Sequence, residues 1–436
     1  MTPDTPVADV VIVGAGPEGM AIAHAFTRRG VRDVIVCAAG IGGSGPPGPT
    51  GDPGPGDVYC SSTVPAPAAM AWAGTHVFEN AVEVLGEDVG YRACGRLVGV
   101  AASDLGGLDA GVAMRRALGI DVRRVDAEAV AASWPEIGVR GFAGFAYEPR
   151  GGYADIRRTA RAFARAARRG GAAILTCAPA VSVAATRDRV TGVRLSDGRE
   201  VAAGTVVVAA GADSPAFVAP LGVHLPVRAT REFTVRVRVG RAVGERPILD
   251  DLPNRRRLRA DGPGHLLLGA LDPAPDAFDD ELTALASAHL AARFPGFPAC
   301  TPVAAFGTRH DAGPDHLPLI GSVGPDGLFV AAGCGEHGLG IVPAVGMLVA
   351  DLLCDGASAR PDIPGTDFRP DRFPARTRSP RPRRHSAQPP GPPGADSGQV
   401  FDPERELHPG REHDPDARLG SEPRSGSDHG FSSDRA

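Results

Sequence analysis

Residues 9–40, DVVIVGAGPEGMAIAHAFTRRGVRDVIVCAAG, decide the fold of this chain. The stretch opens with the apolar, β-branched residues 10–13, turns through GAGPEG and continues with the apolar spacing of a helix. A second apolar run follows at residues 34–37. A strand, a glycine turn, a helix and a second strand are the start of a dinucleotide-binding βαβ unit.

The glycines of this turn have separate roles. Gly14 permits the tight turn, Gly16 lets the backbone approach a pyrophosphate, and Gly19 lets the helix pack close to the strand. Pro17 suits the first helical position, where an N–H group has no partner to lose. The free N–H groups at that end of the helix face the phosphates. The sequence therefore predicts cofactor contacts from Gly14, Ala15, Gly16, Pro17, Glu18 and Gly19.

The context of the motif matters more than its glycines. The chain has 58 glycines in 436 residues, and two further GxGxxG patterns begin at Gly40 and Gly43 with no strand before them. In this family of folds an Asp or Glu at the end of the second strand binds the adenosine ribose. The strand here ends in Cys37, Ala38 and Ala39, so ribose recognition is weakened or supplied by other residues.

Composition excludes several classes of function. A length of 436 residues suffices for two packed domains, and the net charge of −5 favours neither nucleic acid nor an anionic membrane as a partner. The chain has no lysine, which excludes Schiff-base catalysis. Seven cysteines without a CxxC pattern indicate reduced thiols and predict a cytoplasmic protein. We expect no signal peptide, and the longest apolar run, residues 339–350, is shorter than a membrane span.

Apolar periodicity predicts an alternation of helices and strands. Helices are expected at residues 66–85, 109–118, 126–134, 155–169, 279–294 and 341–353. Strands are expected at residues 94–100, 172–177, 181–186, 190–195, 205–209, 228–239 and 328–332, and near Leu258 and residues 266–268. Residues 228–239 alternate strictly, which is typical of a half-buried antiparallel strand.

Two segments are expected to lack regular structure. Residues 40–56 are rich in glycine and proline and predict a flexible surface loop. Residues 370–436 consist mainly of polar residues and proline, so we expect a disordered tail. The histidines of the tail do not have the spacing of metal ligands, and no metal site is predicted.

Three strands of the chain run into glycine turns, at Gly14, Gly211 and Gly333, and an antiparallel section lies between them. This organisation resembles the FAD-dependent amino-acid and amine oxidoreductases of the D-amino-acid oxidase superfamily, in particular the sarcosine and dimethylglycine oxidases and dehydrogenases. The resemblance covers about residues 8–355. It is carried by VVIVGAGPEGMAIAHAFTRRG, EVLGEDVGYRACGRL, PRGGYADIRRTARAFARAARRGGA, RVTGVRLSDGREV, VVVAAGADS, LGVHLPVRATRE, GPDHLPLIG and GLFVAAGCGEHGLGIVPAVG.

The resemblance implies an α/β fold with a discontinuous, Rossmann-like FAD domain of the glutathione-reductase type. That domain would comprise residues 1–85, 150–220 and 310–360. An α+β substrate domain, built on an antiparallel sheet, would comprise residues 86–149 and 221–309. By the same resemblance, the backbone of Val181 contacts adenine, Gly211 lies beside the cofactor, and the amides of a loop face the flavin; that loop contains Gly333, His337, Gly338, Leu339 and Gly340.

The activity implied by the resemblance is oxidation of a C–N bond in a secondary or tertiary amino acid or amine. A hydride passes to FAD, and the resulting imine hydrolyses. Arg309 is the candidate for binding the substrate carboxylate, and Arg259 is a second one. His310 is a candidate for handling a proton. The alternatives are a surface role for Arg309, a packed loop histidine at His310 and a structural role for His337.

The chain departs from the family pattern at several positions. Tyr59 stands where an arginine is expected near the flavin, Asp213 replaces an aromatic residue and Glu336 replaces a glycine of the flavin loop. Thr308 occupies the position where some relatives attach flavin through cysteine, so we expect non-covalent FAD. These changes leave open a catalytically impaired flavin-fold subunit that binds a protein partner, with the tail as a possible contact. An NAD-linked dehydrogenase is the weakest alternative. The electron acceptor, oxygen or a carrier, stays open.

Overall fold

We describe the protein from a computed structural model. The structure describes residues 6–42, 56–240, 242–271, 280–297 and 300–373. Most of the predicted loop and all but the first four residues of the predicted tail therefore lie outside the described residues. No helix among the described residues is long and apolar enough to cross a membrane.

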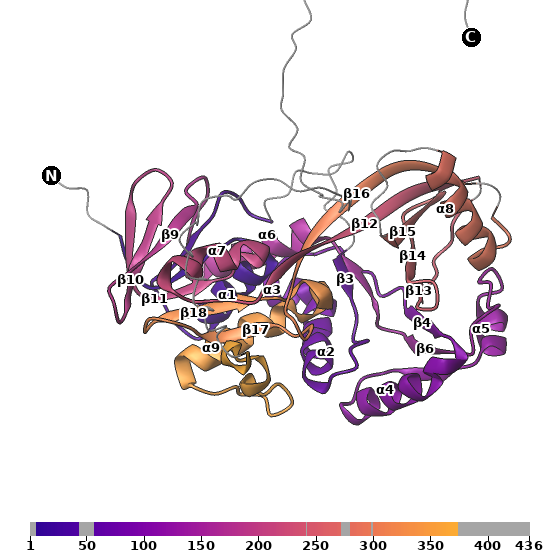
Figure 1. The fold of residues 1–436 in the computed structure, drawn as a ribbon, viewed down its shortest axis with the longest axis horizontal. Helices are drawn as coiled ribbons and strands as arrows, with labels where there is room; N and C mark the ends of the chain where they lie inside the picture. Colours follow the sequence, from indigo (N-terminus) through magenta and orange to yellow (C-terminus); the bar gives the residue numbers. More distant parts are fainter. Residues whose placement is uncertain (1–5, 43–55, 241, 272–279, 298–299, 374–436) are drawn as a thin grey trace, which may run out of the picture. The chain divides into compact units, whose positions relative to one another are not determined.

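The first sheet carries the glycine turns. Among the described residues it has eight strands, with the order β17-β18-β11-β1-β2-β8 and with β10 and β9 following β11 on a side branch (Figure 1). Strands β18, β11, β1, β2 and β8 run parallel. The bounds are β1 (Val7–Val13), β2 (Val34–Cys37), β8 (Ala173–Leu175), β9 (Ala180–Ala185), β10 (Val190–Leu195), β11 (Glu200–Val208), β17 (Leu319–Ser322) and β18 (Leu328–Ala332).

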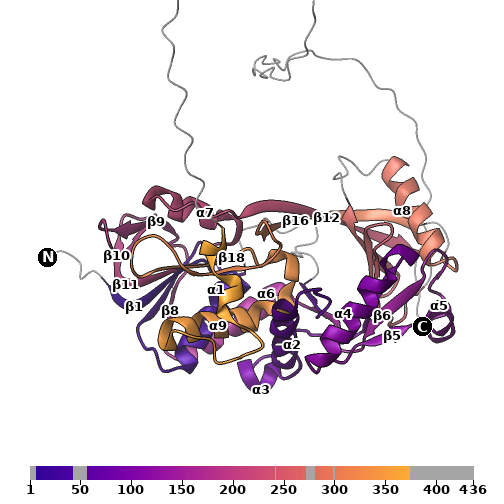
Figure 2. The same ribbon diagram turned by 60° about the horizontal axis from the view of Figure 1, so that its bottom comes forward.

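Helices cover this sheet because its central strands are apolar on both faces. Val10 and Ile12 of β1 face a cluster with α1 (Pro17–Arg28), α6 (Ile156–Arg169) and α9 (Val342–Asp355), whereas Val11 and Val13 face the opposite cluster. Figure 2 shows α1 beside α6 and α9. Helices α2 (Pro65–Glu79) and α3 (Ala81–Leu85) join the first cluster, and α7 (Ser214–Val218) packs on the second. Fully buried parallel strands of this kind are typical of α/β folds.

The second sheet has the strand order β16-β12-β15-β14-β13-β4-β6-β5 and is antiparallel except between β4 and β13. Helices α4 (Leu105–Ala117), α5 (Ala127–Ser133) and α8 (Asp280–Arg293) belong to this part of the chain, and β3 (Gly56–Val58) pairs separately with β7 (Gly152–Ala154). The bounds are β4 (Arg96–Val100), β5 (Arg123–Val125), β6 (Gly144–Glu148), β12 (Arg228–Val239), β13 (Ile248–Asp251), β14 (Arg256–Ala260), β15 (His265–Leu271) and β16 (Cys300–Ala312).

The two sheets are connected by the long strands β12 and β16. Figure 1 shows both strands running from the second sheet toward the first. At the end of β16, Ala312 forms an isolated bridge with Cys334, which follows β18. The second sheet takes its strands from residues 96–148 and 228–312, and the first from residues 7–37, 173–208 and 319–332. The domain bounds inferred from the resemblance stay predictions.

Most predicted elements are present, with a few differences. The expected helix at residues 66–85 is two helices, because Asn80 leaves the helical conformation with φ −108° and ψ 27°. Strand β16 was not predicted, since its sequence CTPVAAFGTRHDA does not alternate cleanly. Asp126 and Asp155 cap α5 and α6 by accepting hydrogen bonds from the N–H groups of Ala129 and Arg158. Residues 370–373 are part of the fold rather than of a disordered tail, since Pro370–Arg372 forms a 3₁₀ turn.

Candidate functional site

The three glycine turns lie at one edge of the first sheet. Val13 at the end of β1 pairs with Val208 of β11, and Val208 pairs with Val330 of β18. Because these strands are parallel neighbours, the turns that follow them leave the sheet at the same edge. Ligands of open α/β sheets bind outside the carboxyl ends of the strands.

The turn between β1 and α1 has the geometry of a pyrophosphate loop. Gly14 has φ +112°, and a Cβ atom at this position would overlap the carbonyl oxygen of Ala209. A Cβ atom at Gly19 would overlap the carbonyl oxygen of Gly14. At Gly16, by contrast, only the Oε2 atom of Glu18 lies within 4 Å of the Cβ position. Close packing thus requires glycine at positions 14 and 19, whereas the space beside the Cβ position of Gly16 is open to a ligand.

The first turn of α1 carries backbone N–H groups that suit an anion. Gly16 is the N-cap residue and has no side chain to accept hydrogen bonds from the N–H groups of this turn. The first N–H groups of a helix have no partner within the helix, and they carry the positive end of its dipole. The turn therefore fits a pyrophosphate, as the sequence predicts for residues 14–19.

The loop after β18 is held by a carboxylate from the second sheet. Asp311 of β16 accepts hydrogen bonds from the backbone N–H groups of Gly333, at 2.5 Å, and Gly335, at 3.0 Å. The Nε2 atom of His337 lies 2.7 Å from the carbonyl oxygen of His316, which gives this side chain a structural contact. Asp311 was not predicted, because the sequence does not show that β16 ends beside this loop.

The far end of the same loop packs against the segment around Tyr59. Gly338 has φ +68°, and a Cβ atom there would lie 2.6 Å from the carbonyl oxygen of Asp57. The Cβ position of Gly340 is 3.2 Å from the Tyr59 nitrogen, and Leu339 is buried. The loop therefore runs from Asp311 to β3 before it enters α9. Its contacts with the flavin stay a prediction.

The adenine end of the predicted site is less defined. Val181 is the second residue of β9 and its side chain is 52% exposed. Ala38 is buried, and its N–H group donates to the carbonyl oxygen of Leu175. The role of Val181 stays a prediction.

A polar hollow lies on the second sheet. It has about 220 Å³ of space, including open solvent, and is lined by Asp57, Glu232, Thr234, Arg257, Arg259, Leu267 and Gly269. Arg259 is 7% exposed, and its guanidinium carbon lies 3.9 Å from the ring centre of Tyr153. The Nε atom of Arg259 is buried without a hydrogen-bond partner among the described residues. An arginine donor left unpaired in a hollow is suited to bind a carboxylate.

The other two predicted catalytic residues lie on opposite faces of β16. Glu232 of β12 pairs with Thr308 in the register, and the Nε2 atom of His310 is 3.8 Å from Glu232 Oε2, so His310 shares the face of the hollow. Arg309 points to the other face, where its Nη1 atom lies 2.9 Å from Asp213 and its side chain is 51% exposed. The structure therefore brings His310 to the face of Arg259 and does not bring Arg309 there.

Tyr59 belongs to a buried group of charges. The guanidinium carbon of Arg96 lies 3.9 Å from the centre of the Tyr59 ring, and Arg96 is 2% exposed. Asp250 and Asp57 pair with both Arg96 and Arg257. Burial alone would raise the pKa of Asp250, but Arg96 and Arg257 hold it below its usual value. An arginine therefore lies next to Tyr59, although position 59 itself has none.

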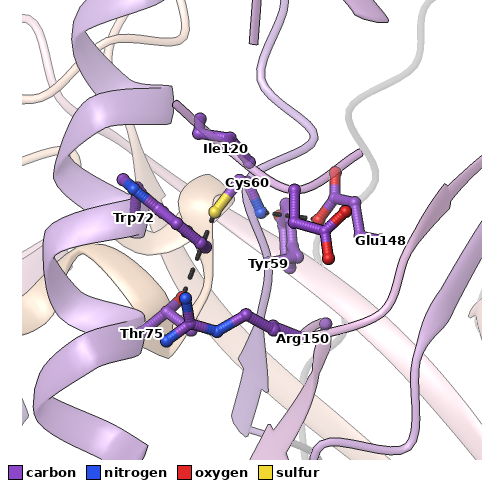
Figure 3. A pocket seen from close by; sticks show the side chains of 9 residues that line it. Tyr59, Cys60, Trp72, Thr75, Ile120, Glu148 and Arg150 are labelled. Carbon is purple, nitrogen blue, oxygen red and sulfur yellow. Dashed lines mark hydrogen bonds between the residues drawn. The ribbon is translucent and has the colours of Figure 1, made fainter. Parts of the chain in front are cut away.

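A second hollow lies behind Tyr59 (Figure 3). Its lining includes Cys60, Trp72 and Glu148. The carboxylate of Glu148 accepts hydrogen bonds from the Cys60 N–H group at 2.9 Å and from the Ser61 hydroxyl at 2.8 Å, and it pairs with Arg115. Burial raises the pKa of the Cys60 thiol. These contacts fix the backbone that leads from β3 into α2.

The described residues form no other obvious reactive centre. None of the seven cysteines forms a disulfide, and all seven are described. No group of three or more metal-ligating side chains occurs in the part of the chain that the structure describes. The side chains of Thr308 and Glu336 are outside what the structure describes.

The fold and the glycine turns define an α/β protein of the dinucleotide-binding type with a second, mostly antiparallel sheet. The family model "FAD dependent oxidoreductase" matches residues 9–352, and the chain therefore belongs to this family, which uses FAD as its cofactor. This confirms the resemblance, the α/β fold class and the predicted cofactor.

Two curated relatives match parts of the chain. The D-amino acid dehydrogenase of Paramagnetospirillum magneticum is 30% identical over 226 residues, which are 50% of this chain and 52% of the relative. The glycine oxidase of Pseudomonas aeruginosa is 33% identical over 180 residues, or 38% of this chain and 46% of the relative. The chain thus matches about half the length of these relatives.

Solved structures match over most of their length. An L-proline dehydrogenase from P. horikoshii has a TM-score of 0.73 at 20% identity, with 85% of this chain and 98% of that chain covered. A glycine oxidase from Geobacillus kaustophilus has a TM-score of 0.71 at 24% identity, with 85% and 100% covered. At these identities the likeness establishes the fold.

Proposed function

We propose that the protein oxidises the C–N bond of an amino acid, with a secondary or tertiary amine of the N-methyl amino-acid type as the preferred substrate. The observation that carries this proposal is Arg259, a buried arginine with an unpaired donor in the polar hollow of the second sheet. Family membership supports the redox chemistry, because FAD accepts the hydride that leaves the carbon beside the amine.

Arg259 would bind and orient the substrate carboxylate. Its stacking on Tyr153 fixes the plane of the guanidinium, and a fixed guanidinium binds a carboxylate with defined geometry. Neighbouring Arg257 is less suited to this role, since its Nε and Nη1 atoms lie 2.9 Å from Asp250 and Asp57. We also favour Arg259 over Arg309, whose guanidinium is paired with Asp213 at the surface.

Glu232 and His310 would handle protons at the same site. The Glu232 carboxylate lies 3.8 Å from Arg257 Nη1 and 3.8 Å from His310 Nε2. An amino acid arrives as an ammonium ion and has to lose a proton before its α-hydrogen can leave as hydride. A carboxylate and a histidine beside the hollow are groups that can take up this proton. Water then hydrolyses the imine product.

The alternative is a flavin-fold subunit with impaired catalysis. It is favoured by the buried group around Tyr59, where Asp57 and Asp250 neutralise both arginines beside the ring. If the flavin binds beside Tyr59, as the resemblance implies, this group of charges would stabilise a negative charge on the ring less than an arginine at position 59 would.

The absorption spectrum of the purified holoprotein, followed by anaerobic titration with candidate amines, distinguishes the active oxidoreductase from the impaired subunit. We expect a yellow protein whose flavin absorbance bleaches on addition of N-methylglycine or another N-alkyl amino acid. The corresponding carboxylic acid without an amine should bleach the flavin more slowly or not at all. Flavin that stays oxidised with a panel of glycine, N-methylglycine, proline and D-amino acids would favour the impaired subunit.

A further inference from the structure

Glu18 puts an acidic side chain into the pyrophosphate loop. It is the second residue of α1, in the turn whose first N–H groups have no partner within the helix and no side-chain cap from Gly16. Its side chain bends back toward the loop, since Oε2 lies 3.4 Å from the Cβ position of Gly16. This is the open side of Gly16 and therefore the side from which a diphosphate would approach. The side chain is half-buried.

The groups that face Glu18 are mainly acidic. Asp311 on β16 is held by the amides of Gly333 and Gly335 and is close enough to raise the pKa of Glu18. Cys334, between those two glycines, is a buried thiol whose pKa is raised by burial, Asp311 and Glu18. No ion pair joins Glu18 to an arginine among the described residues.

Two neighbouring elements carry arginines, Arg157 and Arg309, and neither forms an ion pair with Glu18 in the part of the chain that the structure describes. On α6, the Cγ atom of Arg157 lies 3.6 Å from the Cβ position of Gly42, whose N–H group donates to the carbonyl oxygen of Ala15. Arg309 of β16 forms an ion pair with Asp213, which follows β11. Burial and the negative charge of Asp311 raise the pKa of Glu18 to about 7, although its own backbone N–H group acts in the opposite direction.

We propose that Glu18 is protonated in the FAD-bound protein, so that cofactor binding takes up a proton near neutral pH. Bound diphosphate would cover a carboxyl group that is half-buried before binding, and it would place further negative charge next to that group. Both effects disfavour the carboxylate. A neutral carboxyl group has an O–H donor and does not repel phosphate. The inference rests on the FAD cofactor of the family and not on the proposed substrate.

The proposal gives a defined dependence of FAD affinity on pH. With a pKa of about 7 in the free protein, Glu18 becomes mostly protonated as the pH falls below this value, and the affinity for FAD then levels off. Above pH 7 the group has to take up a proton on binding, so the dissociation constant rises with pH. The limit for one linked proton is about tenfold per pH unit.

The test measures FAD release from the purified holoprotein. The holoprotein is diluted stepwise at pH values from 6.0 to 8.5, and the fluorescence of free flavin gives the dissociation constant at each pH. Protons exchanged on release are measured at pH 8 with an indicator dye in weak buffer. The same measurements are made on Glu18→Gln, which keeps the size of the side chain and removes its titration, and on Glu200→Gln as a matched control at the exposed start of β11.

For the unmodified protein and the Glu200→Gln control, we expect FAD to bind at least five times more weakly at pH 8.5 than at pH 6.5, with a proton released when FAD leaves. In Glu18→Gln both effects should disappear, and FAD should bind more tightly at pH 8.5 than in the unmodified protein. A flat profile in the unmodified protein, or an unchanged slope in Glu18→Gln, would overturn the proposal. Neither result depends on amine oxidation, so a failure of the proposed substrate class would be seen separately.

Discussion

The glycine-turn edge of the first sheet and the polar hollow of the second sheet are built in different ways. At the glycine-turn edge the backbone presents the predicted cofactor contacts, through close-packed glycines and the N–H groups of the first turn of α1. At the hollow the side chains of three strands and of β3 form the surface, and the charges are arginines and carboxylates. The first site depends on the absence of side chains, and the second depends on which side chains are paired.

The largest effect should come from adding a methyl group to the glycine-turn edge. In Gly14→Ala the new Cβ atom would overlap the Ala209 carbonyl oxygen, at a φ of +112° that L-residues disfavour. We expect loss of bound FAD, measured as the ratio of flavin to protein absorbance. Gly204→Ala on β11 is the control, because only the far end of Arg189 comes within 4 Å of its Cβ position. Normal flavin content in Gly14→Ala would show that this turn does not hold the cofactor.

The next effect concerns the buried charges beside the hollow. Arg96→Met would leave the Asp57 and Asp250 carboxylates without one of their two arginines at a site that is nearly free of solvent. Removing one partner of a buried ion pair typically destabilises a protein by about 3–5 kcal/mol. Chemical unfolding of the holoprotein measures this change. Arg165→Met removes an exposed pair with Glu87 and should leave the unfolding midpoint nearly unchanged. Equal stability of the two variants would contradict this account.

The two candidate arginines can be separated by substrate kinetics. Arg259→Met should raise KM about 10- to 100-fold with unchanged flavin content, because hydrogen bonds to a charged group contribute about 1.5–3 kcal/mol. Arg309→Met should change KM less than about fivefold, since its pair with Asp213 is exposed. The reverse order of effects would assign the substrate carboxylate to Arg309, as the resemblance implies.

The smallest effect is a pH dependence of stability in the first cluster. Burial, with Arg28 and Arg169 nearby, lowers the pKa of His24 on α1 to about 4. Because the folded-state pKa is below the value of about 6.5 in an unfolded chain, folding is favoured above pH 6.5 and this contribution is lost as the pH falls toward 4. We expect a loss on the order of 2 kcal/mol, measured by urea unfolding at several pH values.

The control for this prediction is His24→Gln, which cannot titrate. Its free energy of unfolding should fall less steeply between pH 6.5 and 4 than that of the unmodified protein. His289 on α8, whose pKa burial also lowers to about 4, would continue to titrate in the variant and report on the second sheet. The same slope in both proteins would mean that His24 is accessible to water in the folded state.

Local patterns were enough to predict the glycine loop after β1, whereas they could not place the candidate substrate residues relative to one another. Gly14, Gly16 and Gly19 lie in one turn, so their spacing alone defines a loop. Arg259 and His310 lie on β14 and β16, which are separated in the sheet by β15 and β12. Choosing between Arg259 and Arg309 required the strand register, which decides the face on which each side chain lies.

Two residues that the sequence pattern did not single out, Asp311 and Arg96, were missed for the same reason. Asp311 was passed over because the strand that carries it has no clear alternation, and the significance of its carboxylate depends on two amides more than twenty residues away. Arg96 was passed over because an arginine in an apolar strand is read as solvent-exposed unless its partners are known. Both partners of Arg96, Asp57 and Asp250, come from distant segments.

The sequence by itself determined the family, the α/β class, the FAD cofactor and the glycine turns, because these depend on backbone conformation and on short-range spacing. Only the tertiary structure decided that the three turns share one edge, that Arg259 has an unpaired donor and that Glu18 faces Asp311. These are relations between charges and surfaces on distant segments, and their energies depend on distance and burial, which a linear sequence does not contain.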